Sequence, residues 1–248
     1  MKIQTNVPLK NKNWFKTGGP AKYYCRPKTT KDFQTALLFA KEKSLPIFFL
    51  GDGANILIND NGFGGLVVHP LNNTISIDKE AHQITAGAGS HIKDVINFAL
   101  DNNLLGLEEF SGIPGTIGGA TYMNIHYFNH MLDDFLLEAT VISRKTGNIK
   151  IVEREWFNFG YDKSRLHKKF YYLIDTTFQL KTGRQAQIKK SKKQRDETIK
   201  ERNSRYPTER TCGCFFQNFS KQEIENNKKT NTTSIASYFE QLGFPGTL

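Results

Sequence analysis

Apolar residues in the first third of the chain recur either with helical spacing or in short unbroken runs. Helical spacing predicts a helix over residues 31–43, capped by Thr30. The apolar run 47–50 ends at a glycine and indicates a buried strand that leads into a loop. Shorter runs predict further strands at 56–58, 66–68, 74–77 and 83–86.

The rest of the chain alternates between the same two patterns. Ser90 is expected to cap a helix whose inward face carries Ile92, Val95, Ile96 and Ala99. A hairpin is predicted from strands 139–143 and 149–152 around a Lys-Thr-Gly-Asn turn, and a long strand at 171–180. Helices are predicted at about 187–202 and 234–242. The alternation of helices and strands points to a mixed α and β fold.

Composition narrows the class of protein. Hydrophobic residues make up 38% of the 248, enough for a packed core. No apolar run reaches the length of a membrane span, and the N-terminal residues lack the apolar stretch of a signal peptide. Three cysteines do not suggest a disulfide framework. We therefore expect a cytoplasmic protein without membrane insertion.

The formal net charge of +10 is concentrated in one segment. Between Arg184 and Arg205 there are nine Lys and Arg residues against three Asp and Glu. Three interpretations remain open: a solvated helix face, a nucleic-acid footprint, or general attraction for a phosphorylated small molecule. No aromatic residues alternate with the basic ones as a single-strand binder requires, and we expect no nucleic-acid partner.

Three glycine-rich clusters, at 51–55, 87–90 and 112–120, fall within one 70-residue span. Glycine permits positive φ and close approach of successive N–H groups to an anion, which a diphosphate requires. Tight turns are the alternative. None of the clusters is followed by Gly-Lys-Ser/Thr, and none matches the six-residue dinucleotide fingerprint. The pattern indicates a phosphate-bearing cofactor outside the P-loop and Rossmann frames.

Three strings together resemble a known family. They are Phe15-Lys16-Thr17-Gly18-Gly19-Pro20-Ala21, the Gly51 loop with Asp60-Asn61-Gly62-Phe63, and Gly112 to Ala120 followed by Tyr122-Met123-Asn124. The chain resembles the UDP-N-acetylenolpyruvoylglucosamine reductases (UDP-N-acetylmuramate dehydrogenases) from about residue 13 to 246, in the family's order. The string 112–124 is the most specific part.

The resemblance implies an α+β fold. An FAD-binding module of the vanillyl-alcohol-oxidase (PCMH) type would comprise two subdomains, residues 1–73 and 74–183. Residues 184–248 would form an incomplete α/β substrate-binding domain. A change of composition near residue 183 independently favours a boundary there.

The resemblance also implies an enzyme that uses FAD and NADPH. NADPH would reduce the flavin, and the flavin would pass a hydride to UDP-N-acetylglucosamine-enolpyruvate, giving UDP-N-acetylmuramate for peptidoglycan. The implied FAD-binding residues are Gly51, Asp52, Gly53, Ala54, Asn55, Ile56, Gly87, Gly112, Pro114, Gly115, Thr116, Gly118, Gly119, Ala120 and Asn124. The implied substrate-binding residues are Ser164, Gln217 and Asn218.

The family's proton-donating serine matches Cys214, in Thr211-Cys212-Gly213-Cys214-Phe215-Phe216-Gln217-Asn218. A thiol with a reference pKa near 8.5 is mostly protonated at neutral pH and can donate a proton to a carbanion-like carbon. A Cys-x-Cys metal pair offers too few ligands, and a buried inert thiol is the remaining alternative. We expect Cys214 to be catalytic, with Tyr161 and Arg165 beside it.

Several positions depart from the family's pattern. Asp162 stands where the family has arginine, which reverses the charge near flavin and substrate; Arg165 or Lys163 could compensate. His126 lies in a bulkier, aromatic loop and is either a ligand-facing group or a packing residue. Gln217 replaces a lysine, and no residue matches the family's C-terminal glutamate.

Two functional hypotheses follow from these departures. The first is the reductase in divergent form, and the second is an FAD- or UDP-sugar-binding homologue that has lost turnover.

Overall fold

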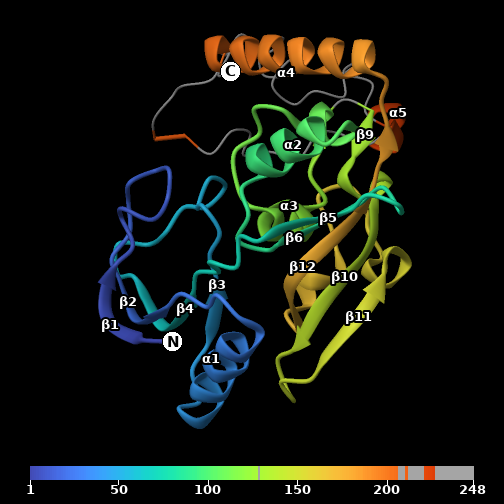
Figure 1. Cartoon of the computed structure of the whole chain (residues 1–248). Coiled ribbons are helices and arrows are strands. Elements are labelled where there is room, and N and C mark those ends of the chain that lie inside the picture. Colours follow the sequence, from blue (N-terminus) through green and yellow to red (C-terminus); the bar gives the residue numbers. More distant parts are fainter. Residues whose placement is uncertain (128, 206–209, 212–220, 227–248) are drawn as a thin grey trace, which may run out of the picture.

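The computed structural model describes residues 1–127, 129–205, 210–211 and 221–226. Two β-sheets stand side by side in it (Figure 1). One sheet belongs to the first third of the chain and the other to the middle. A long basic helix crosses above the second sheet and its helices.

The first sheet has the strand order β1-β2-β4-β3. Its outer pair is antiparallel, whereas β2 and β3 both run parallel to β4. Helix α1 packs against it and begins with Thr29, whose side chain accepts a hydrogen bond from the backbone of Asp32 in a capping box. The cap is therefore one residue earlier than predicted. The bounds are β1 Ile3–Pro8, β2 Pro20–Cys25, α1 Thr30–Glu42, β3 Ile47–Phe49 and β4 Phe63–Val68.

The strand predicted at 56–58 is wrong. These residues form an irregular loop, and Leu57 is 68% exposed. Ile58 instead lies under the backbone of Gly18, where a Cβ would come within 2.6 Å of it. Its apolar character thus serves loop packing rather than a sheet. Strands β1 and β2 are the elements of this sheet that the sequence pattern did not predict.

The second sheet is antiparallel throughout, with the order β11-β10-β12-β6-β5. The predicted hairpin is confirmed: β10 pairs with β11 so that Ile142 faces Ile149. The strands predicted at 74–77, 83–86 and 171–180 are also present. The bounds are β5 Ile75–Asp78, β6 Gln83–Gly87, β10 Leu136–Ser143, β11 Ile149–Glu153 and β12 Tyr171–Gln179.

Helices α2 and α3 pack on the second sheet and bury the four apolar residues expected of α2. The N-cap of α2 is His91 and not Ser90, whose buried hydroxyl has no hydrogen-bond partner among the described residues. Short elements complete this lobe. They are α2 Ile92–Asp101, β7 Leu104–Leu105, η1 Leu107–Phe110, α3 Ile117–Met123, β8 His126–Tyr127, β9 His130–Met131, η2 Leu132–Asp134, η3 Arg154–Phe157, η4 Arg165–Lys168 and β13 Lys181–Thr182.

The two sheets share part of their hydrophobic core. Ile142, Tyr172 and Ile174 of the second sheet pack with Phe33 and Leu66 of the first lobe in one cluster. A second, larger cluster lies between α2, α3 and the second sheet. The first sheet is thereby held against β12, and the space between them is where the candidate site lies.

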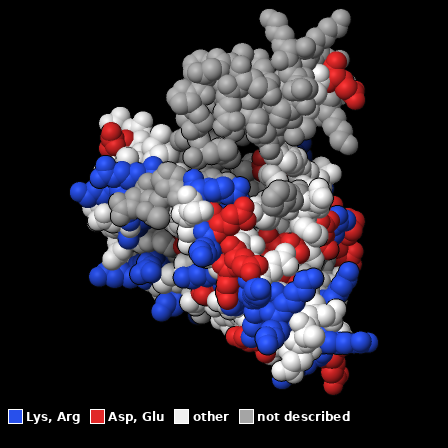
Figure 2. All heavy atoms as spheres, turned by 90° about the horizontal axis from the view of Figure 1, so that it is seen from above, with Lys and Arg blue, Asp and Glu red and all other residues white. Residues whose placement is uncertain are grey.

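The basic segment forms α4 (Gln185–Arg205), followed by α5 (Lys221–Asn226). Within the described residues, α4 buries one side chain, Ile188, and ion pairs occupy much of its charge. Lys192 Nζ lies 2.6 Å from Asp101 of α2, and Lys193 lies 3.6 Å from Glu197. Seen from above, basic and acidic side chains are interleaved (Figure 2). This arrangement favours the solvated-face interpretation.

Three predictions concern features that the structure does not decide. The helix expected at 234–242 lies outside the described residues, and the boundaries at 73/74 and 183/184 stay predictions. None of the helices in the described ranges combines the length and apolar character that crossing a lipid bilayer demands.

Candidate cofactor site

A cavity of about 840 Å³ lies between the first sheet, α3 and β12. This volume falls within the roughly 300–1,000 Å³ typical of small-molecule sites. Two of the predicted glycine-rich segments line it, 51–56 and 112–120. Its walls are otherwise apolar and aromatic, with contributions from Trp14, Phe49 and Tyr172.

The 51–56 loop leaves β3 after the fully buried Leu50 and turns into the cavity. None of its six backbone N–H groups donates a hydrogen bond to the described part of the chain. Buried or half-buried N–H groups are nearly always paired, so a run of free donors on a cavity wall is typical of an anion site. Asp52 anchors the loop through His91 Nδ1, 2.8 Å from its carboxylate.

Glycine is required in these loops for two different reasons. A Cβ on Gly51 would lie 2.6 Å from Thr116 Oγ1, and one on Gly118 would lie 2.9 Å from the Ala88 carbonyl. Gly115 and Gly119 differ: a Cβ would meet nothing closer than 3.9 Å and 3.7 Å respectively, although both residues line the cavity. Protein packing does not explain their missing side chains, whereas a ligand in the cavity does.

Most of the other predicted cofactor residues also line this cavity. Gly112 adopts φ +78°, and its Cα faces Arg202 of α4. Thr116 caps α3 through Gly119 N–H at 3.3 Å. The members of this group that line the cavity are Asp52, Gly53, Ala54, Asn55, Ile56, Gly112, Pro114, Thr116 and Ala120.

Gly87 does not line the cavity. A Cβ there would lie 1.9 Å from the Asn72 carbonyl oxygen, so glycine is needed for packing beneath the 70–73 segment. Its neighbour Ala88 lines the cavity in its place. The turn at 87–90 thus has the tight-packing role that the sequence left open.

Asn124 is likewise absent from the cavity wall and is fully buried. It ends α3 in the left-handed conformation with φ +49°. Its side chain donates to Asp133 Oδ1 at 2.9 Å and to the Gly160 carbonyl at 3.2 Å, and accepts from Asp133 N–H at 3.0 Å. Asp133 is in turn bound by Arg154 at 2.7 Å. Asn124 therefore acts as a structural pin behind the cavity.

The predicted residues between 161 and 165 are dispersed. Ser164 is buried and donates its hydroxyl hydrogen to the Tyr122 carbonyl at 2.7 Å, away from the cavity wall. Arg165 places its guanidinium 5.0 Å from the Trp156 ring centre and also does not line the cavity. Tyr161 is 39% exposed and stacks on His126. Cys214, Gln217 and Asn218 lie outside the described residues.

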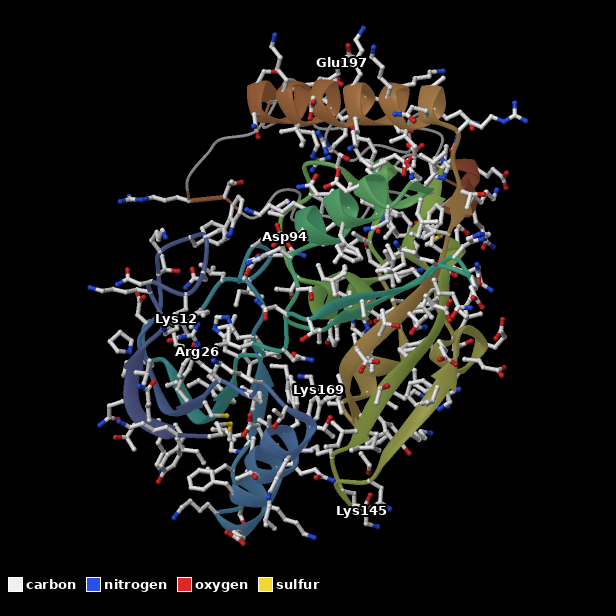
Figure 3. All side chains as sticks on the ribbon, in the orientation of Figure 1. Lys12, Arg26, Asp94, Lys145, Lys169 and Glu197 are labelled. Atoms are coloured by element: carbon white, nitrogen blue, oxygen red, sulfur yellow. The ribbon has the colours of Figure 1, made fainter. Side chains whose placement is uncertain are left out.

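The cavity wall also contains residues that sequence reasoning did not assign to it. Lys169 lies between the two sheets and lines the cavity (Figure 3). Asp162 and His126 line it as well, and the His126 Nδ1 atom lies 3.4 Å from Asp162 Oδ1. The departures from the family's pattern at 126 and 162 were the available signal. Their spatial pairing was not visible in the sequence.

Titratable groups beneath the cavity loop are shifted by burial. Burial, reinforced by Arg26 and Lys12, lowers the pKa of His69 to about 4. Tyr24, whose hydroxyl lies 2.8 Å from His69 Nδ1, has its pKa raised to about 12, mainly by burial. Among the described residues, no group of three or more His, Cys, Asp or Glu side chains is arranged to hold a metal ion.

Comparison with known proteins places this geometry in a class. The family described as "FAD binding domain" matches residues 21–153. A UDP-N-acetylenolpyruvylglucosamine reductase structure from Thermus caldophilus superposes with a TM-score of 0.78 at 24% identity, covering 99% of this chain and 82% of that one. A 6-hydroxy-D-nicotine oxidase from Arthrobacter nicotinovorans gives a TM-score of 0.51 at 17% identity, covering 73% and 42%.

The chain is thus an FAD-binding oxidoreductase with the α+β fold of the vanillyl-alcohol-oxidase type, as predicted. The reductase of Listeria monocytogenes serotype 4a is 34% identical over 216 residues, 87% of this chain and 71% of the relative. Reductase 2 of Bacillus cereus ATCC 14579 is 35% identical over 230 residues, 91% and 74%. The chain belongs to the UDP-N-acetylenolpyruvoylglucosamine reductase family.

Proposed function

We propose that this protein reduces UDP-N-acetylglucosamine-enolpyruvate to UDP-N-acetylmuramate with NADPH, as a cytoplasmic step of peptidoglycan synthesis. The single observation that carries the proposal is the 51–56 loop, which turns six unpaired N–H groups toward a cavity opposite Gly115 and Gly119. This wall suits the diphosphate of FAD, and the family's name supplies the substrate class.

The loops would hold and orient FAD. When bound, FAD supplies the hydride chemistry that no protein side chain can provide. Residues 51–56 would bind its diphosphate, Gly115 and Gly119 would allow close approach, and the Asp52–His91 contact would keep the loop in place. The apolar walls would exclude water from the reacting atoms.

The segment after α4 would complete the reaction. Thr211, the first residue of the Cys214 string, lines the cavity, which supports the assignment of the following residues to the substrate end. Cys214 would donate the proton to the substrate carbon, and Gln217 and Asn218 would contact the UDP-sugar. Residues 184–248 would then form the substrate-binding domain beside the cofactor subdomains 1–73 and 74–183.

The proposal is tested with the purified holoprotein under anaerobic conditions. We expect a flavin absorption spectrum, bleaching on addition of NADPH, and recovery on addition of the enolpyruvyl substrate, with UDP-N-acetylmuramate identified by mass spectrometry. UDP-N-acetylglucosamine, which lacks the enolpyruvyl group, is the matched control and should restore no absorption. A spectrum that bleaches but does not recover with the enolpyruvyl substrate would refute the reductase assignment.

Replacement of the proposed acid separates the two half-reactions. Cys214→Ala is expected to slow substrate-dependent recovery by about 10²-fold or more and to leave NADPH-dependent bleaching near the wild-type rate. Cys212→Ala, two residues upstream, is the matched control. Equal slowing of both half-reactions in Cys214→Ala would indicate a folding role for the thiol instead.

A second candidate function has one specific observation in its favour. Asp162 lines the cavity at the position where the family's pattern has arginine, and a carboxylate there repels an anionic substrate. A homologue that binds FAD and UDP-sugars without turnover would show the flavin spectrum and bind the sugar nucleotide, yet form no product.

A further inference from the structure

Two positions that depart from the family's pattern meet in the cavity wall. His126 is on the short strand β8, and Asp162 lies in the turn between η3 and η4. Their closest side-chain atoms, Nδ1 and Oδ1, are 3.4 Å apart, a distance typical of an ion pair. Both residues line the cofactor cavity.

The backbone fixes where the carboxylate stands. Asp162 adopts φ +50°, an uncommon conformation for a residue with a side chain. The turn is closed by paired hydrogen bonds between Gly160 and Lys163 at 3.0 and 3.2 Å, and Asn124 holds the Gly160 carbonyl from below. A turn tied down at both ends presents the Asp162 side chain to one neighbour, the imidazole of His126.

The imidazole is held on two sides. Its ring centre lies 4.3 Å from that of Tyr161, and its buried Nδ1 atom has no hydrogen-bond partner among the described residues. The Asp162 carboxylate is the anion nearest to that nitrogen. Because Nδ1 faces Asp162, Nε2 is the nitrogen left for a ligand. An imidazolium in this setting is a cation that its carboxylate partner stabilises.

The pair lies at the α4 end of the cavity. Tyr127, next to His126, has its ring 5.1 Å from the guanidinium carbon of Arg202, near the end of α4. The chain continues from there to Thr211, which lines the same cavity. This is the end to which the proposed function assigns the substrate, remote from the 51–56 loop's contact with α2.

We propose that His126, oriented by Asp162, binds the carboxylate of the enolpyruvyl substrate and supplies the positive charge that arginine carries at position 162 in the family's pattern. The inference rests on the proposed function. It explains why a carboxylate is tolerated at 162: the negative charge is directed at the imidazole, and the imidazole offers a donor to the substrate. Asp162 is a positioning residue in this scheme.

The experiment measures ligand affinity by isothermal titration calorimetry with the FAD-loaded protein. His126→Phe keeps an aromatic ring against Tyr161 and removes both nitrogens. We expect its affinity for the enolpyruvyl substrate to fall about 10- to 100-fold, because a charge-assisted hydrogen bond is lost and Asp162 is left facing the carboxylate. Affinity for UDP-N-acetylglucosamine, which lacks that carboxylate, should change less than about threefold.

Two further variants make the test specific. Asp162→Asn should weaken binding of the enolpyruvyl substrate in the same direction by a smaller factor, because the imidazolium loses its partner. The double variant H126F/D162R puts arginine where the family's pattern has it and should recover most of the lost affinity. Recovery in the double variant is not expected if His126 merely packs against Tyr161.

The outcomes separate this inference from the function on which it rests. Wild-type protein that neither binds nor reduces the enolpyruvyl substrate overturns the proposed function. If wild-type protein binds and reduces it, equal affinities in wild type and His126→Phe overturn the carboxylate contact alone. Parallel loss of both ligands in His126→Phe, without rescue by Asp162→Arg, assigns His126 a structural role and also overturns the inference.

Discussion

The rings of Phe49 and Tyr172 stack with their centres 4.0 Å apart and their planes 18° from parallel. Phe49 ends the β3 strand of the first sheet, and Tyr172 belongs to β12 of the second. Both rings also line the cofactor cavity. One aromatic contact therefore joins the two sheets and forms part of the wall between which a ligand would lie.

Truncation of this stack should weaken the whole fold. Phe49→Ala is expected to lower the free energy of unfolding by about 3 kcal/mol, since it removes a half-buried ring and leaves a cavity between the sheets. Tyr172→Phe keeps the stack and removes a buried hydroxyl that has no partner among the described residues, so its effect should stay within about 1 kcal/mol. Urea unfolding of both variants measures the difference. Similar losses in the two would contradict a stacking role.

The open space at Gly119 predicts a variant that folds but binds FAD poorly. A methyl group at Gly119 meets no protein atom closer than 3.7 Å and extends into the cavity, within a helix where alanine is favoured over glycine. Gly119→Ala should keep or slightly raise apoprotein stability and weaken FAD affinity about tenfold, or about 1.4 kcal/mol. Flavin fluorescence quenching on binding measures the affinity.

Gly118→Ala is the matched control for that prediction. Its methyl group would lie 2.9 Å from the Ala88 carbonyl, so the fold itself should lose stability. FAD affinity that is unchanged in Gly119→Ala would mean that the cofactor does not approach this turn.

The Asn124 network predicts a purely structural loss. Asn124→Ala removes three hydrogen bonds in a buried cluster and should cost about 2–4 kcal/mol of stability. Asn158 has a similar left-handed backbone with φ +46° but is exposed, so Asn158→Ala isolates the backbone contribution of about 1 kcal/mol. Thermal or urea unfolding of the apoproteins compares them. A small loss in Asn124→Ala would argue for a direct role in cofactor binding instead.

Burial of His69 predicts a pH-dependent stability. Its pKa is about 4 in the folded protein, mainly through burial, against about 6.5 in the unfolded chain. The unfolded chain therefore binds more protons between these values. The stabilisation is complete above about pH 6.5 and is lost as the pH falls toward 4, with an upper bound of about 3 kcal/mol.

His69→Asn provides the comparison, because it keeps a polar atom for the Tyr24 hydroxyl and cannot take up a proton. Urea unfolding at pH 7 and pH 5 should show a smaller stability difference for the variant than for wild type. Equal differences would show that other groups cause the acid destabilisation.

Local sequence patterns were sufficient for elements whose neighbours along the chain decide their structure. Helix α1, helix α4 and the β10–β11 hairpin each follow from residue spacing and turn composition. The pattern was wrong at 56–58, where apolar residues pack under a loop of the first sheet. A short apolar run does not reveal which distant segment will cover it.

The sequence by itself determined the fold class and the glycine-rich segments at 51–56 and 112–120, because backbone freedom and family motifs are encoded in adjacent residues. Tertiary structure alone decided that Gly87 packs beneath Asn72 while Gly115 opens into the cavity. It also decided that Asn124 binds Asp133 and that His126 meets Asp162. These roles depend on contacts between residues distant in the chain, and one-dimensional spacing does not specify which of them meet.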